Sequence, residues 1–260
     1  MSGKSMEFAR YPDLPGKLVV VTGGGTGIGA AIVEAFAGQG AHVVFLDVQD
    51  APSQELAQKL AKSSFPPRYV HCDLTDLEQL GAAFAGITRD YGAVDILVNN
   101  AANDQRHQVQ EVTPQYWDQS LAVNLRHQFF CAQAVLPGMQ EKKSGVILNF
   151  GSISWHLALA GLPLYMASKA AIEGLTRGLA RELGPHGIRV NCVVPGAVNT
   201  PRQMALWQTA ESEAGILAAQ CLPQRVQTDD VAALTLFLAS SNAARCSGRE
   251  YFVDAGWYGA

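Results

Sequence analysis

The chain has 260 residues, of which 48% are hydrophobic and 16% are charged, and its formal net charge is −4. This length and composition fit one domain over residues 1–260 with a large buried core, and they exclude a disordered chain. The acidic balance provides no long-range attraction to nucleic acid or to an anionic membrane surface. We therefore expect a small-molecule ligand and no nucleic-acid partner.

The longest aliphatic stretches, such as residues 18–21, have the length of a strand, whereas a membrane-spanning helix needs about 20 apolar residues. The first residues, 1–7, are polar and include no apolar signal region, so we expect no export. The five cysteines are scattered and form no C-x-x-C pair, which predicts reduced thiols in a cytoplasmic protein. The six histidines lack the spacing of a zinc site, so we expect no metal.

Short β-branched runs alternate along the chain with longer amphipathic segments, and this alternation predicts an α/β fold with a parallel sheet covered by helices on both faces. Strands are expected at residues 17–22, 42–47, 69–72, 95–99, 146–150, 189–194 and 251–253. Helices are expected from about residue 28 to Gly38 and at 52–62, 77–90, 114–139, 164–183 and 229–239. Residues 197–224 have an apolar pattern of their own, which we interpret as a mobile helical lid.

The first strand is followed by the glycine-rich segment Thr22-Gly-Gly-Gly-Thr-Gly-Ile-Gly29. Glycines between a strand and a helix allow a tight turn and bring backbone amides close to a pyrophosphate. Asp47 ends the second strand about 20 residues later, where a carboxylate binds the adenosine ribose and repels a 2′-phosphate. Neither Thr26 nor Val48 supplies a basic partner for such a phosphate, so the pattern favours NAD over NADP. The alternatives are a glycine turn that serves packing alone and an aspartate that caps a turn.

The glycine segment is followed in order by further motifs: Asn99-Asn100-Ala101-Ala102, Asn124, Ser152, Tyr165-x-x-x-Lys169 and Pro195-Gly196. In this order and over nearly the whole chain, the motifs resemble those of the short-chain dehydrogenase/reductase family. Ala102 departs from the family's usual glycine without removing a chemical group. The resemblance implies a single Rossmann-type, doubly wound, seven-stranded sheet and an NAD-dependent oxidoreductase.

The resemblance also implies which residues hold the cofactor. Asp73 would contact the adenine, residues 99–101 would lie beside the adenosine ribose, and residues 194–200 would border the nicotinamide. Asp73 has an alternative reading as part of a helix cap, in which Thr75 is the capping residue. The expected cofactor-binding residues are Gly23, Thr26, Gly27, Ile28, Gly29, Asp47, Asp73, Leu74, Asn99, Ala101, Tyr165, Lys169, Pro195, Gly196, Val198 and Thr200.

Tyr165 and Lys169 are four residues apart, so on a helix they share one face. A free tyrosine has a pKa of about 10, but a nearby ammonium stabilises the phenolate, and Tyr165 can then take a proton from a substrate hydroxyl. By the resemblance, Lys169 also holds the nicotinamide ribose, Ser152 orients the reacting oxygen, and Asn124 orders a water in a proton path. Taken alone, Tyr165 and Lys169 would be an ordinary amphipathic helix pair.

Polar and aromatic stretches at residues 103–107, 152–156 and 202–204, together with Trp207, indicate a pocket for a polyhydroxylated ligand, which needs convergent donors and a flat apolar surface. These stretches resemble those of bacterial aldose 1-dehydrogenases. The resemblance implies oxidation of the anomeric hydroxyl of an aldopentose to a lactone, by a homotetramer. The expected substrate-binding residues are Asn103, Ser152, Ser154, His156, Tyr165, Gln203 and Trp207.

Plainer interpretations remain open for this pocket. Asn103 could be a residue of a polar loop tip, Trp207 a packing residue, and His127 is more typical of a structural residue than of a ligand. One alternative function is oxidation of a secondary alcohol of a polyol or of a 2-keto-3-deoxy sugar acid. Another is a non-catalytic dinucleotide sensor, against which the intact Ser152, Tyr165 and Lys169 argue.

Overall fold

The computed structural model describes residues 7–207 and 209–259. Outside the described residues lie residues 1–6, on which the expectation about export partly rests, and Gln208 of the expected lid. Seven strands form one parallel sheet in the order β3-β2-β1-β4-β5-β6-β7. The strands are β1 Leu18–Thr22, β2 His42–Asp47, β3 Arg68–His71, β4 Ile96–Asn99, β5 Gly145–Phe150, β6 Ile188–Pro195 and β7 Glu250–Val253. The predicted seven-stranded, doubly wound sheet is confirmed, with each strand within two residues of its expected position.

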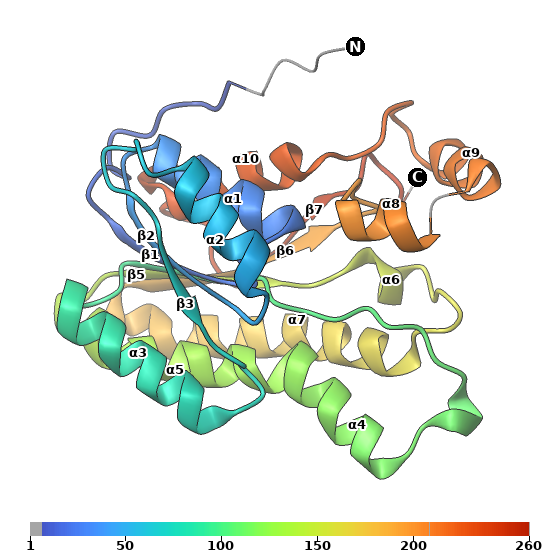
Figure 1. Ribbon diagram of the computed structural model, residues 1–260, viewed down its shortest axis with the longest axis horizontal. Helices are drawn as coiled ribbons and strands as arrows, with labels where there is room; N and C mark the ends of the chain where they lie inside the picture. Colours follow the sequence, from blue (N-terminus) through green and yellow to red (C-terminus); the bar gives the residue numbers. More distant parts are fainter. Residues whose placement is uncertain (1–6, 208, 260) are drawn as a thin grey trace.

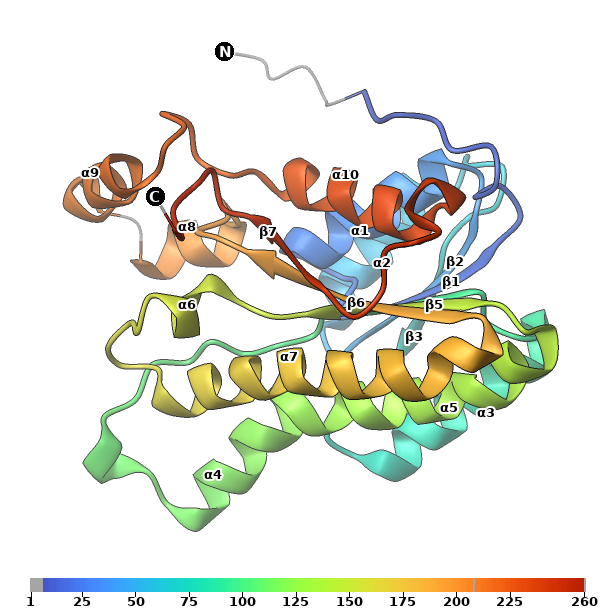
Figure 2. The ribbon, with the colours of Figure 1, turned by 180° about the vertical axis from the view of Figure 1, so that it is seen from behind.

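Helices cover both faces of this sheet (Figures 1 and 2). One face carries α1 (Gly27–Gly38), α2 (Asp50–Lys59) and α10 (Thr228–Ala239), and the other carries α3 (Leu77–Tyr91), α5 (His127–Lys142) and α7 (Pro163–Leu183). Because side chains alternate along a strand, Val19 and Val21 of β1 pack in the core beneath α1, whereas Leu18 and Val20 pack in the core on the opposite face. The short 3-10 turns η3 (Gly184–His186) and η4 (Ser241–Ala243) directly follow α7 and α10.

The expectation of one continuous helix at residues 114–139 is wrong. This segment is divided into α4 (Pro114–Leu121), the π-helical turn η2 (Ala122–Arg126) and α5. A π turn inserts one extra residue into the helical hydrogen-bond ladder, a change that hydrophobic periodicity does not reveal and that often marks a functional position. The elements that were not expected also include the 3-10 turn η1 (Val109–Glu111) and the short helix α6 (Ile153–His156).

The segment expected to be a lid contains two helices, α8 (Pro201–Trp207) and α9 (Ala210–Ala219). Thr209 caps α9, since its side chain accepts a hydrogen bond from the Ser212 amide. Figure 1 shows both helices beside the carboxyl ends of β6 and β7, away from the main helical layers. Within residues 7–207 and 209–259, none of the helices combines the length and the apolar character needed to cross a membrane.

Candidate active site

A cavity of about 620 Å³ lies at the carboxyl ends of the strands. Its walls come from the segments that follow β1, β2, β3, β4, β5 and β6. Strand β1 lies between β2 and β4, so the chain winds in opposite directions on the two sides of β1. This switch point is where doubly wound sheets bind their ligands.

The glycine-rich segment forms one wall of this cavity. Gly23 has a φ of +63°, and a Cβ added there would lie 2.8 Å from the Ala101 Cα, so a larger residue would be both strained and blocked. A Cβ on Gly29 would overlap the Gly23 carbonyl oxygen. Thr26 precedes α1 without a side-chain cap, which leaves the first amides of that helix to face the cavity. This arrangement fits the pyrophosphate of a dinucleotide.

Asp47 is buried at the end of β2, with 7% of its surface exposed. Its Oδ2 accepts a hydrogen bond from the Gly25 amide at 2.8 Å, and its Oδ1 accepts one from the Gln49 amide at 2.9 Å. The carboxylate therefore stabilises the glycine-rich turn, as the capping alternative predicted. An ionised carboxylate has about four lone-pair sites, so these two bonds leave capacity for a ribose hydroxyl.

The part of the cavity that was expected to hold the adenine differs from the expectation in the residue that caps α3. Asp73 lines the cavity, and its Oδ1 accepts hydrogen bonds from the Thr75 amide at 2.9 Å and from the Thr75 hydroxyl at 2.7 Å. Thr75 does not cap α3; the cap is Asp76, whose side chain accepts hydrogen bonds from the first amides of that helix.

The structure contradicts the expectation that Asn99 forms part of the wall beside the adenosine ribose. Asn99 is fully buried and does not line the cavity. Its Nδ2 donates to Asn149 Oδ1 at 2.9 Å and to the Gln128 carbonyl at 3.2 Å, so Asn99 connects β4 to β5 and α5. Its neighbour Asn100 lines the cavity and donates to the carbonyls of Thr22 and Gly23. Asn99 follows the alternation of β4 into the sheet, whereas Asn100 lies beyond the end of the strand.

Ser152, Tyr165 and Lys169 lie together in the cavity. Ser152 is the N-cap of α6, and its hydroxyl donates to the Ser154 hydroxyl at 3.0 Å. Tyr165 and Lys169 lie on successive turns of α7, and the Lys169 Nζ is 5.4 Å from the centre of the Tyr165 ring. Lys169 is 1% exposed, and its Nζ donates to the Phe150 carbonyl at the end of β5 at 2.7 Å.

The electrostatics of this group differ from the expectation that Lys169 lowers the Tyr165 pKa. Burial raises the pKa of Tyr165 above 10, the Asp104 carboxylate raises it further, and the hydrogen bond with Ser152 lowers it. Burial also lowers the pKa of Lys169 from 10.5 to about 8, although Cys192 and Asp104 act in the opposite direction. For both side chains, burial, which disfavours the charged form, is therefore the largest effect on the pKa.

Asn124 lies in the π turn η2 and is 1% exposed. Its Oδ1 accepts a hydrogen bond from the Asn103 amide at 2.8 Å, and its Nδ2 donates to the Asn103 carbonyl at 3.1 Å. The π turn thus places an asparagine that clamps the loop after β4. Asn124 itself does not line the cavity.

Of the residues expected to bind substrate, the structure brings Ser154, Gln203 and Trp207 to the cavity wall. It does not bring His156 there, because the His156 Nε2 lies 2.8 Å from Glu173 Oε1 and both side chains are buried. Asn103 is also absent from the wall; its Oδ1 accepts hydrogen bonds from the Gln105 amide and from Arg202. The structure therefore does not place His156 and Asn103, two of the expected substrate-binding residues, on the cavity wall.

The remaining expected residues line the cavity together. They are Gly23, Thr26, Gly27, Ile28, Gly29, Asp47, Asp73, Leu74, Ala101, Ser152, Ser154, Tyr165, Lys169, Pro195, Gly196, Val198, Thr200, Gln203 and Trp207. His127 is fully buried, with its Nε2 at 3.1 Å from the Ala101 carbonyl oxygen, so it is a structural residue.

The family model described as enoyl-(acyl carrier protein) reductase matches residues 23–258. D-xylose 1-dehydrogenase of Caulobacter vibrioides is 57% identical over 252 residues, which cover 97% of this chain and 100% of that protein. The chain belongs to the short-chain dehydrogenase/reductase family. The protein is a dinucleotide-binding oxidoreductase.

Two further relatives of this dehydrogenase match over nearly the whole length. A protein of Rhizobium meliloti named "Probable galactose dehydrogenase GalD" is 45% identical, over 97% of this chain and 99% of that protein. The crystal structure of a gluconate 5-dehydrogenase from Burkholderia cenocepacia, in complex with NADP and tartrate, has a TM-score of 0.88 and 30% identity, and the match covers 95% of this chain and 96% of that chain.

The structure adds residues of the dehydrogenase that were not assigned a role from the sequence. Asp104, Arg106 and Arg202 line the cavity. The Arg106 guanidinium lies over the Trp207 ring, 4.3 Å from its centre. Asp104 and Arg202 form an ion pair, with the Arg202 Nε at 3.0 Å from Asp104 Oδ1. The polar stretches that contain these residues were identified from the sequence. The contacts between them could not be predicted from it, because partners almost 100 residues apart in sequence produce no local pattern.

Proposed function

We propose that this dehydrogenase oxidises the anomeric hydroxyl of an aldopentose to an aldonolactone, with NAD as the electron acceptor. The observation that carries the proposal is the 57% identity to a D-xylose 1-dehydrogenase over 97% of the chain. The cavity supports it, because the polar side chains of Ser154, Gln203 and Asp104 line the same cavity as Ser152 and Tyr165. A sugar ring, with several hydroxyls and an apolar C–H face, suits such polar groups beside Trp207.

The proposed reaction breaks two bonds at the anomeric centre. The C1–H bond breaks with its electron pair, the O1–H proton passes to the Tyr165 phenolate, and the C1–O1 bond becomes the double bond of the lactone. When bound, NAD supplies the acceptor for the electron pair and hydrogen that leave C1. Ser152 hydrogen-bonds O1 and holds it beside Tyr165.

Lys169 has two proposed tasks. Its ammonium stabilises the Tyr165 phenolate against the burial that raises the pKa of this tyrosine. It also donates to the nicotinamide ribose, while its bond to the Phe150 carbonyl keeps the Nζ in place. Asn124 retains one N–H and one carbonyl lone pair beyond its two bonds to Asn103, which suffices to hold a water in a proton path.

We assign the cofactor site by the same reasoning. The amides of residues 23–29 hold the pyrophosphate, Asp47 accepts from the adenosine ribose hydroxyls, and Asp73 contacts the adenine. Val48 and Gln49, which follow Asp47 in the cavity wall, carry no positive charge to pair with a 2′-phosphate. Asp47 would repel that phosphate, so the proposal is NAD rather than NADP.

We further propose that residues 1–260 act as one domain with a lid at 197–224, in a cytoplasmic homotetramer. Trp117 of α4 and Phe129 of α5 are 46% and 43% exposed, and such large apolar side chains support pairing of this face with a second copy. Light scattering coupled to size exclusion measures the mass of the assembly. A monomeric mass would contradict the tetramer.

The test of the reaction is a substrate panel followed by the absorbance of the reduced cofactor. We expect turnover with D-xylose or another aldopentose and NAD, lower kcat/KM with NADP, and a lactone as the first product. Polyols and 2-keto-3-deoxy sugar acids are the comparison substrates. Turnover of these alone would reject anomeric oxidation, and binding of NAD without turnover of any alcohol would indicate a dinucleotide sensor.

A further inference from the structure

A carboxylate lies in the cavity near the proposed proton-transfer group. Asp104 is in the loop after β4, lines the cavity, and has a side chain that is 24% exposed. Its negative charge raises the pKa of both Tyr165 and Lys169. None of the motifs that assign the cofactor and the proton transfer includes Asp104.

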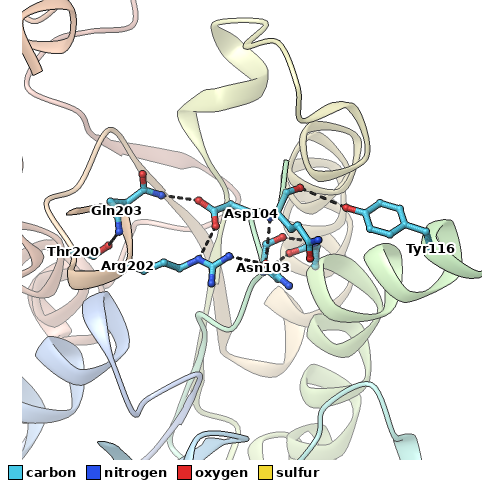
Figure 3. Close-up of polar contacts among 8 residues, drawn as sticks. Asn103, Asp104, Tyr116, Thr200, Arg202 and Gln203 are labelled. Carbon is cyan, nitrogen blue, oxygen red and sulfur yellow. Dashed lines mark hydrogen bonds and ion pairs between the residues drawn. The ribbon is translucent and has the colours of Figure 1, made fainter. Parts of the chain in front are cut away.

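Helix α8 of the lid holds this carboxylate from one side, as Figure 3 shows. The Arg202 Nε donates to Asp104 Oδ1 at 3.0 Å, and the Gln203 Nε2 donates to Asp104 Oδ2 at 2.6 Å. Arg202 also donates to the Asn103 side chain at 3.1 Å. Each oxygen of Asp104 is therefore oriented by a donor from a segment almost 100 residues away.

The main chain beside Asp104 is held from the opposite side. Asn124 accepts from the Asn103 amide and donates to the Asn103 carbonyl, so the residue before Asp104 is fastened to the buried turn η2. A side chain held between a buried turn and the lid has lost its freedom before a ligand arrives. Such preorganisation is what a binding group needs in order to discriminate between ligands.

The chemistry of this group suits a neutral polyhydroxylated ligand. An ionised carboxylate only accepts hydrogen bonds and has about four lone-pair sites, of which α8 uses two. Sugar hydroxyls are donors, and their bonds to a charged acceptor are stronger than bonds between neutral groups. A carboxylate in the ligand would instead be repelled.

We propose that Asp104 is a specificity-determining residue of this dehydrogenase and that its carboxylate accepts a hydrogen bond from a hydroxyl of the sugar other than the one that is oxidised. The inference rests on the proposed function, because it concerns the sugar of that reaction. Arg202 and Gln203 position the carboxylate. The competing explanation is that Asp104 only fastens the lid, in which case it would affect every substrate equally.

The test compares Asp104→Asn with the unaltered enzyme on D-xylose and on pentoses that lack the 2-, 3- or 4-hydroxyl. Asp90→Asn is the matched control, because Asp90 also accepts hydrogen bonds from an arginine, Arg89, but lies exposed at the end of α3. Melting temperatures and NAD affinity, measured by calorimetry, report on folding and on the cofactor site. If D104N does not fold, Asp104→Glu replaces it: this variant keeps the charge that pairs with Arg202 but moves the carboxylate by one methylene, so the same comparison of D-xylose with the deoxy sugars applies.

We expect D104N to lose about 10- to 100-fold in kcat/KM on D-xylose, since a hydrogen bond to a charged group is lost. One deoxy sugar should be turned over equally well by D104N and by the unaltered enzyme, because its missing hydroxyl is the donor to Asp104. NAD affinity should be unchanged, and D90N should match the unaltered enzyme throughout.

Two results would overturn the inference about Asp104. One is a kcat/KM on D-xylose within about twofold of the unaltered enzyme, and the other is an equal loss on every deoxy sugar, which indicates a lid fastener. Failure of the proposed function is seen separately, as an unaltered enzyme that turns over no pentose. The comparison then uses the alcohol that this enzyme does oxidise and the deoxy forms of that alcohol, with the same two criteria.

Discussion

We expect the stability difference between the Lys169→Met variant and the unaltered enzyme to depend on pH. The Lys169 ammonium is 1% exposed, and burial lowers its pKa from 10.5 to about 8. A lysine with a lowered pKa destabilises the folded state while it stays protonated, and this cost disappears as pH rises from about 8 to about 10.5. Methionine has a similar length and carries no charge, so K169M is free of this cost at every pH.

The magnitude follows from the shift. At pH 7 the buried ammonium costs the folded state about 3 kcal/mol, and at pH 9.5 the cost is about 1.5 kcal/mol. K169M also leaves the Phe150 carbonyl without its donor, which costs roughly 1–3 kcal/mol at either pH. The free energy of unfolding of K169M relative to the unaltered enzyme should therefore fall by about 2 kcal/mol between pH 7 and pH 9.5.

Thermal unfolding followed by circular dichroism, at equal protein concentrations, measures this change. For a chain of this size, 1 kcal/mol corresponds to about 2–4 °C in Tm, so the Tm of K169M relative to the unaltered enzyme should fall by roughly 4–8 °C over this pH range. Lys62→Met is the control, because Lys62 is exposed. K169M should also lose sugar oxidation.

The difference between the two proteins isolates Lys169, since all other titrating groups are present in both. A Tm difference that stays constant within about 1 °C between pH 7 and pH 9.5 would refute the assignment of a depressed Lys169 pKa. A difference that grows in favour of K169M with rising pH would show that the sign is wrong.

Three further substitutions test the site. Tyr165→Phe should lower kcat by at least about 100-fold and leave NAD affinity by calorimetry unchanged, because only the proton acceptor is lost; retained turnover would contradict its role. Asp47→Ala should weaken NAD binding and raise the ratio of kcat/KM with NADP to that with NAD by about tenfold, and an unchanged ratio would reject Asp47 as the source of cofactor preference. Glu173→Ala should lower Tm by roughly 6–20 °C, since it leaves the Trp155 and His156 ring nitrogens without their buried acceptor at 2.8 Å. Glu173→Gln keeps an acceptor and should lower Tm by less. Equal decreases in Tm for the two variants would contradict this role of Glu173.

The amino-acid sequence alone determined the layers of the fold and the end of the sheet that holds the site. Short continuous apolar runs such as β2 predicted the positions of the strands, because a strand buried on both faces needs β-branched and aliphatic residues throughout. The glycines of residues 23–29 and the pair Tyr165 and Lys169 were recognisable for a local reason. Their roles depend on neighbours a few residues away, within one turn or one helix.

Tertiary structure decided which polar side chains reach the cavity. His156 has the expected short separation from Ser152, but it turns toward Glu173 of α7, because two buried polar groups must satisfy each other. Asn99 turns into the sheet, and the π turn at Asn124 is invisible to apolar periodicity. Asp104 meets its partners on α8 from almost 100 residues away. Hydrogen bonds over such separations depend on how the loop and the helix α8 pack, so only the tertiary structure shows which polar side chains line the cavity.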